Sequence, residues 1–113
     1  MLKFLCLLFG LVLPAVTATA QTYYGRGDTS CGSWNQERAA GSVNAIVYQQ
    51  WIAGFISGVN TGDVINKRPD FLRHTEPAQI LTDIDDYCSS QPNKTLVEAA
   101  IAVIITLRKN ASS

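Results

Sequence analysis

The spacing of the apolar residues constrains the fold of this chain more than any other feature. In the segments 43–59 and 80–88, apolar side chains recur at intervals of three and four, which is the period of one helix face, and the segment 96–107 is apolar on nearly all sides. No segment of useful length alternates between apolar and polar residues as a strand would. The sequence therefore predicts an all-α fold: a small domain of three to four helices, with a short helix near 33–40 ahead of three longer ones.

Capping signals indicate where these helices begin and end. Ser42 is placed to cap a helix of about 17 residues that ends near 60–62. Thr75 is the expected start of the next helix, and Thr95 opens a capping box ahead of the last one. The segment 60–74 contains only turn signals, so we expect it to be an irregular loop.

Residues 1–20 have the organisation of a cleaved secretory signal peptide. A lysine in MLK precedes the apolar run FLCLLFGLVL, and ATA places small residues before position 21. The apolar run is shorter than the roughly 20 residues that a membrane-spanning helix needs. We expect the mature protein to be a single helical domain of residues 21–113 with an irregular arm at 21–32, located in the periplasm or secreted.

Two cysteines, Cys31 and Cys88, remain once Cys6 is removed with the signal peptide. In an oxidising exported compartment, such a pair in a small domain is expected to form one disulfide. Closing so long a loop is worth about 4 kcal/mol in the chain-entropy estimate. A metal site would need more ligands than the single histidine, His74, can supply, so we expect no metal and no cofactor.

Charge and side-chain chemistry argue against several functional classes. Without Lys3, eight basic residues face nine acidic ones, a balance that offers no basic field for nucleic acid or anionic lipid. The acidic cluster of Asp83, Asp85 and Asp86 lacks the glycine and distal glutamate of a calcium loop, and we expect it to be a solvated helix face. No serine near His74 stands in a nucleophile-elbow motif, so we expect no catalytic residues and no enzyme activity.

The stretch WIAGFISGVN (51–60) contains two glycines four residues apart, Gly54 and Gly58, and each costs a helix roughly 1 kcal/mol relative to alanine. In a long apolar span this spacing would mark a transmembrane interface, but the polar neighbours and the short apolar length exclude a span here. We expect the glycines, with Trp51 and Phe55, to pack against the alanines of the last helix. A surface for a partner protein is the alternative.

The segment YCSSQPNKTL (87–96) resembles part of the HdeA/HdeB family of small periplasmic proteins, and the HdeB branch in particular. The similar elements are Tyr87-Cys88, Pro92, Lys94 and Leu96. The positions of the two cysteines and the length of the mature chain are similar as well. The resemblance implies an ATP-independent acid-stress chaperone that is folded and dimeric or oligomeric near neutral pH. Protonated carboxylates would weaken its native contacts in acid, and the exposed apolar surface would hold unfolding client proteins.

A second resemblance keeps another class open. WIAGFISG (51–58), the YC pair and a closing helix are also similar to small periplasmic immunity proteins of type VI secretion systems. That likeness implies a helical, disulfide-linked protein that dimerises and blocks the active site of a toxin, using Trp51, Phe55 and the 60–74 loop. A third class is a non-enzymatic accessory of the envelope or of a secretion apparatus. The expected partner is therefore another protein or an unfolded client, with a homodimer as a further alternative.

Overall fold

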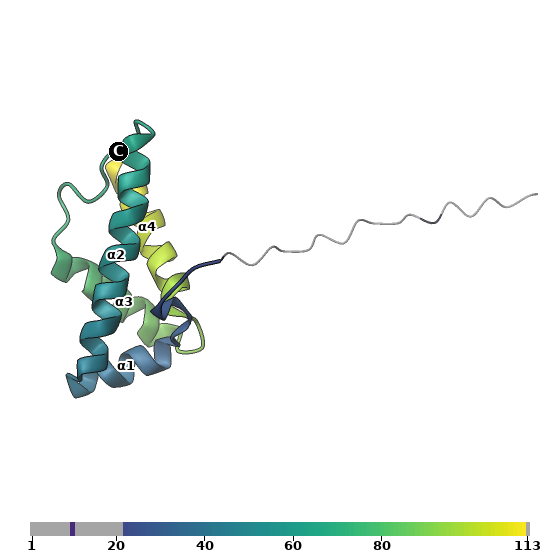
Figure 1. The fold of residues 1–113 in the computed structure, drawn as a ribbon, viewed down its shortest axis with the longest axis vertical. Coiled ribbons are helices and arrows are strands. Elements are labelled where there is room, and N and C mark those ends of the chain that lie inside the picture. The colour runs from purple at the N-terminus through teal and green to yellow at the C-terminus, as the bar shows by residue number, and fades with distance from the viewer. Residues whose placement is uncertain (1–9, 11–21, 113) are drawn as a thin grey trace, which may run out of the picture.

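The computed structural model describes residue 10 and residues 22–112, which contain four α-helices preceded by one short 3-10 helix (Figure 1). The elements are η1 Arg26–Asp28, α1 Cys31–Ala40, α2 Val43–Ile65, α3 Pro77–Ser90 and α4 Leu96–Ala111. These residues form no β-strand, and the predicted all-α fold class is confirmed. The predicted signal peptide, Gly10 apart, lies outside the described residues and stays a prediction.

Hydroxyl side chains cap the first turns of three helices. Ser30 caps α1, so this helix starts earlier than the sequence predicted. Ser42 caps α2, and Thr95 opens a complete capping box on α4, both as predicted. Gly41 ends α1 in the left-handed conformation (φ 61°), which glycine adopts without strain.

The longest helix, α2, runs about one turn further than predicted, to Ile65. The polar residues near position 61 do not break it, since Thr61 donates its hydroxyl hydrogen to the Ser57 carbonyl within the helix. At the next boundary, Glu76 rather than Thr75 is the residue before α3, and Pro77 is its first residue. The irregular loop therefore spans 66–76 and not 60–74.

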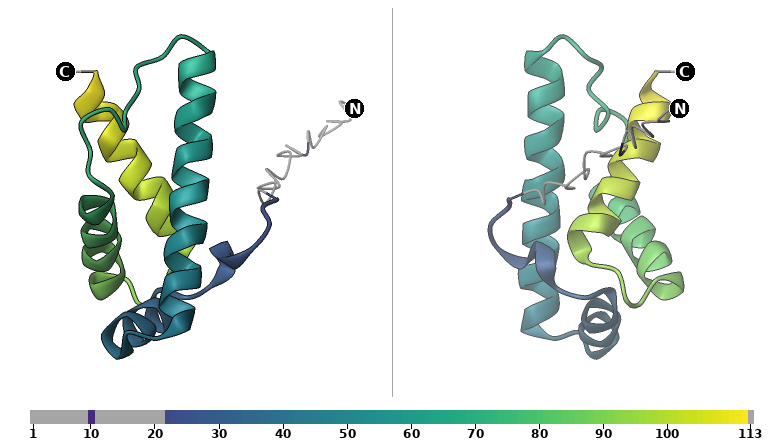
Figure 2. Two further views of the ribbon diagram at one scale, coloured as in Figure 1. Left: turned by 60° about the vertical axis from the view of Figure 1, so that its left-hand side comes forward. Right: turned by 90° about the vertical axis from the view of Figure 1, so that its right-hand side faces the viewer.

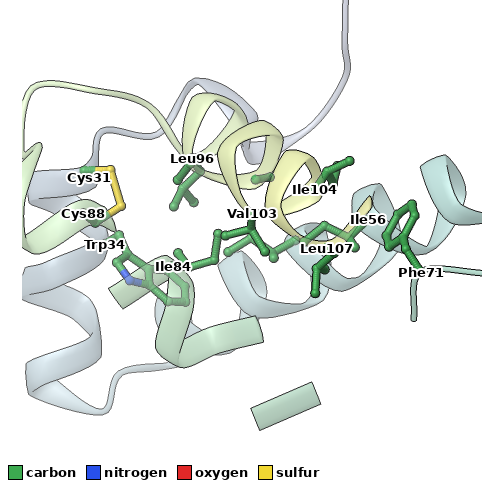
Figure 3. Packing of buried hydrophobic residues seen from close by; sticks show 13 residues of the cluster. Cys31, Trp34, Ile56, Phe71, Ile84, Cys88, Leu96, Val103, Ile104 and Leu107 are labelled. Atoms are coloured by element: carbon green, nitrogen blue, oxygen red, sulfur yellow. A yellow bond between two sulfur atoms is a disulfide. The ribbon is translucent and has the colours of Figure 1, made fainter. Parts of the chain in front are cut away.

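The four helices enclose one hydrophobic core. Figures 1 and 2 show α2 and α4 side by side, α3 on the other side of α4, and α1 crossing below them. Trp34, Ile56, Ile84 and Leu96, one from each helix, are fully excluded from solvent (Figure 3). Burying side chains of this size contributes roughly 1.5–3 kcal/mol each. Phe71, from the 66–76 loop, closes the core near the C-terminal end of α4.

The predicted disulfide is present between Cys31 and Cys88, whose sulfur atoms are 2.15 Å apart (Figure 3). It joins the first residue of α1 to the end of α3 across a sequence separation of 57. Backbone hydrogen bonds reinforce this junction, with the Cys31 N–H donating to the Lys94 carbonyl at 2.7 Å. Among the residues that the structure describes, no helix has the length and apolar character to cross a membrane.

Candidate partner-binding surface

Gly54 and Gly58 lie on the solvent side of α2, so the predicted packing of these glycines against the last helix is wrong. A Cβ atom placed on either residue meets no other heavy atom within 4 Å. The buried side of α2 instead carries Ile52 and Ile56, both fully excluded from solvent. Apolar residues occupy most of the circumference of this helix, so their spacing alone does not decide which side of the helix points into the core. The large side chains fill the core, as close packing of the interior requires.

The exposed residues of α2 form an uncharged surface, which we call the outer face. Val43 and Ile65, at its two ends, keep 76% and 74% of their surface in solvent. The only charged residue of this 23-residue helix is Asp63, which is buried. The outer face comprises Val43, Asn44, Ile46, Val47, Gln50, Ala53, Gly54, Ser57, Gly58, Thr61, Val64 and Ile65. A helix face in water ordinarily carries charged side chains, so this composition indicates a contact surface.

Trp51 holds the N-terminal arm against α2 and is not a free surface residue. Its indole Nε1 donates a hydrogen bond to the Tyr24 carbonyl oxygen at 2.8 Å. The backbone at Gly25 and Gly27 lies so close to the ring that a Cβ atom on either would come within 2.6 Å of it. The ring also stacks on Phe55, with centroids 5.0 Å apart. The arm is therefore anchored by an aromatic side chain, which its irregular, glycine-rich sequence did not indicate.

An apolar groove lies between α2 and α4, next to the outer face. Phe55 and Val59 line it from α2, while Ile101, Ile104 and Ile105 line it from α4, with Arg108 at one end; we call it the α2–α4 groove. Ile105 keeps 61% of its surface in solvent. The last helix is therefore covered on only part of its circumference, although its sequence is apolar on nearly all sides.

An ion pair between buried Asp63 and exposed Arg108 joins the C-terminal ends of α2 and α4. Arg108 donates to both carboxylate oxygens of Asp63, from Nε and Nη2, at 2.8 Å each. Arg68 approaches the same carboxylate at 3.8 Å. The hydrogen bonds from Arg108 are the main reason that the pKa of Asp63 lies below its ordinary value, and they outweigh the opposite effect of burial. A lone acidic residue in an apolar helix was the only sequence signal for this pair, and it does not reveal the partner.

A second ion pair joins α1 to α3 and corrects the expectation for the acidic cluster. Arg38 donates from Nε to Asp85 Oδ1 at 3.0 Å and from Nη2 to Oδ2 at 2.6 Å. The Trp34 indole Nε1 also donates to Asp85 Oδ1, at 2.8 Å. Asp85 is therefore a cross-helix anchor, whereas Asp83 and Asp86 have no ion-pair partner among the described residues. In the same part of the chain, no three His, Cys, Asp or Glu side chains are grouped to hold a metal ion.

His74 is exposed at the edge of a hollow between the 66–76 loop and the C-terminal end of α4. Arg73 and Asp70 line the same hollow, which has a volume of about 470 Å³. None of the side-chain hydrogen bonds described for this protein joins His74 to a serine or an aspartate, as a catalytic triad would require. Apolar and uncharged polar residues predominate on the outer face, in the α2–α4 groove and in this hollow; Arg108 lies at the groove, and Asp70, Arg73 and His74 lie at the hollow.

Comparison of the chain with protein-family models, curated proteins and solved structures finds no match in any of the three.

Proposed function

We propose that this chain is a non-enzymatic, exported protein-binding domain that contacts a partner protein in its folded state through the outer face and the α2–α4 groove. The observation that carries the proposal is the absence of charge across every exposed position of α2, beside an apolar groove. The centres of protein interfaces are depleted in charged residues in the same way. Covering one exposed side chain such as Ile65 would contribute roughly 1–2 kcal/mol.

The outer face has about half of the area that one partner contributes to a standard protein interface. A helix of 23 residues is about 35 Å long and 10–12 Å wide with its side chains, so the outer face covers roughly 400 Å² in projection. One partner in a protein interface of standard size contributes about 800 Å². The α2–α4 groove adjoins the outer face and supplies further area. The two surfaces are adjacent because Phe55, in the groove, and Gly58, on the outer face, lie about one turn apart on α2.

Binding in the folded state agrees with the immunity or inhibitor class, or with an envelope accessory, more directly than with an acid-activated chaperone. A chaperone of that kind would conceal its apolar surface until acid opens the fold. Here the outer face is exposed while both ion pairs and the disulfide are intact. The partner would be a protein of the same exported compartment.

Site-specific photocrosslinking tests the proposal in the producing cell. A benzophenone amino acid replaces Val47 on the outer face in one variant and exposed Asp86 on α3 in the matched control. The proposal predicts a covalent adduct with a different protein from position 47 only, and abolition of this adduct by Ile105→Glu in the groove. An equal adduct from position 86, or an adduct with nothing except a second copy of the chain, would contradict it.

The Asp63–Arg108 pair favours acid-triggered client binding as a second candidate. Acid would protonate Asp63 and remove the charge that holds the end of α2 to α4. The disulfide would keep α1 and α3 linked while α2 moves away, which would expose the buried side of α2. This sequence of events agrees with the resemblance to the HdeA/HdeB family.

Aggregation of a model client enzyme at pH 2–3 tests this second candidate. Protection by the wild-type protein, and protection at a higher pH by Asp63→Asn, would support acid-triggered binding, because the amide imitates the protonated carboxyl group. Absence of protection with an unchanged circular dichroism spectrum in acid would eliminate it.

A further inference from the structure

We infer that the hollow between the 66–76 loop and the C-terminal end of α4 binds a carboxylate group carried next to an apolar group. Its apolar walls include Phe71, Leu107 and Pro69, and its polar rim includes Arg73 and His74. The volume of about 470 Å³ lies within the range of small-ligand sites. The inference deepens the proposed function, on which it rests, by naming a group that the partner would present.

The basic side chains of the hollow have no counter-ion of their own. Neither the Arg73 guanidinium nor the His74 imidazole makes a hydrogen bond or an ion pair within the described part of the chain. Guanidinium groups bind carboxylates through two parallel hydrogen bonds, and imidazole can donate one more. An incoming carboxylate would therefore find donors that the protein itself leaves unused.

The walls of the hollow are already held in place. Asn60 on α2 donates from Nδ2 to Asp70 Oδ1 at 2.8 Å and accepts the Phe71 N–H at 2.9 Å. Asp70 Oδ1 also accepts the Leu72 N–H at 3.1 Å, so this carboxylate is directed to the loop although it lines the hollow. Phe71 is 4% exposed, and the central carbon of the Arg108 guanidinium lies over it, 5.9 Å from the centroid of the Phe71 ring.

The electrostatic potential at this end of the molecule also favours an anion. The ends of α2 and α4 and the 66–76 loop meet there (Figure 1). This end carries Lys67, Arg68, Arg73, Arg108 and Lys109 against Asp63, Asp70 and Glu76. The described chain as a whole has one more acidic than basic residue, so this end is more positive than the rest of the chain.

NMR titration of the oxidised mature protein at pH 7 tests the inference with matched probes. N-acetyl-phenylalanine and acetyl-Ala-Ala-Phe carry the carboxylate, as a small acid and as a peptide C-terminus respectively, and their C-terminal amides are the controls. We expect millimolar binding of both acids with shifts at Phe71 and His74, and about tenfold weaker binding of both amides. If the tripeptide binds more tightly than N-acetyl-phenylalanine, the site is assigned to polypeptide C-termini. If the two acids bind equally, the site is assigned to small acids.

Two charge variants complete the test. Arg73→Gln should weaken the binding of both acids about tenfold, whereas Arg26→Gln, on the exposed arm, should leave it unchanged. Equal affinity of acids and amides, no shifts at the hollow, or no effect of Arg73→Gln would overturn the inference. Any of these results would leave the crosslink from position 47 unaffected, so failure of this inference is distinguishable from failure of the proposed function.

Discussion

Alanine at Gly54 and Gly58 should stabilise the protein, and this prediction tests the orientation of α2 on which the binding surface depends. Both positions lie within the helix and on its solvent side, and an added Cβ meets no atom within 4 Å. Glycine costs a helix interior about 0.8–1.0 kcal/mol relative to alanine, so each substitution should return most of that amount. The double variant should gain about 2 kcal/mol in the free energy of unfolding.

That gain should be readily measured as a change in melting temperature. In a domain of this size, 1 kcal/mol shifts the midpoint by about 4–8 °C, so the double variant should melt about 10 °C higher. The assay is thermal unfolding of the oxidised protein at pH 7, followed by circular dichroism. Ile56→Ala is the counterpart on the buried side, and it should lose about 2–5 kcal/mol.

The opposite pattern would refute this account of α2. If Gly54→Ala and Gly58→Ala both lowered the melting temperature while Ile56→Ala was tolerated, the glycines would face the core. The helix would then present its large apolar residues to solvent, contrary to their burial here. Neither the outer face nor the α2–α4 groove would then exist as described.

Three further perturbations give separate tests. Replacing Cys31 and Cys88 with serine should cost about 4 kcal/mol of stability, measured by urea unfolding, and an equal stability of both forms would contradict the structural role of the disulfide. Gly27→Ala should displace the arm and move the Trp51 fluorescence to longer wavelength, since the added Cβ would lie 2.6 Å from the ring, and an unchanged spectrum would contradict this anchor. Ionised Asp63 should stabilise the fold at pH values above its ordinary pKa of 3.8, and this stabilisation should disappear as the pH falls through its lowered pKa in the folded protein. Asp63→Asn should remove that part of the acid dependence, and an acid unfolding curve unchanged by the substitution would contradict this role.

Local sequence signals predicted the fold well where a few neighbouring residues decide the structure. Ser42 and Thr95 cap helices by hydrogen bonds to backbone groups three residues away, so their roles can be recognised without tertiary information. The cysteine pairing followed because only Cys31 and Cys88 remain after the predicted signal peptide.

Tertiary contacts decided the features that local reasoning missed. The inner face of α2 depends on which side chains fill the core, and a helix with apolar residues around most of its circumference leaves that choice open. Asp63 and Arg108 are 45 residues apart, and the spacing of charges within one helix cannot pair them. The extra turn of α2 has the same origin, because the ion pair of Asp63 holds it against α4.

The binding of the uncharged dye Nile red at pH 7 tests most directly whether the folded protein presents an apolar binding surface. We expect blue-shifted emission with the wild-type protein at pH 7. The double variant Val47→Glu and Ile105→Glu should lose this emission while its circular dichroism spectrum stays unchanged. Dye binding that is absent at pH 7 and develops only below about pH 4 would contradict folded-state binding and favour acid-triggered exposure.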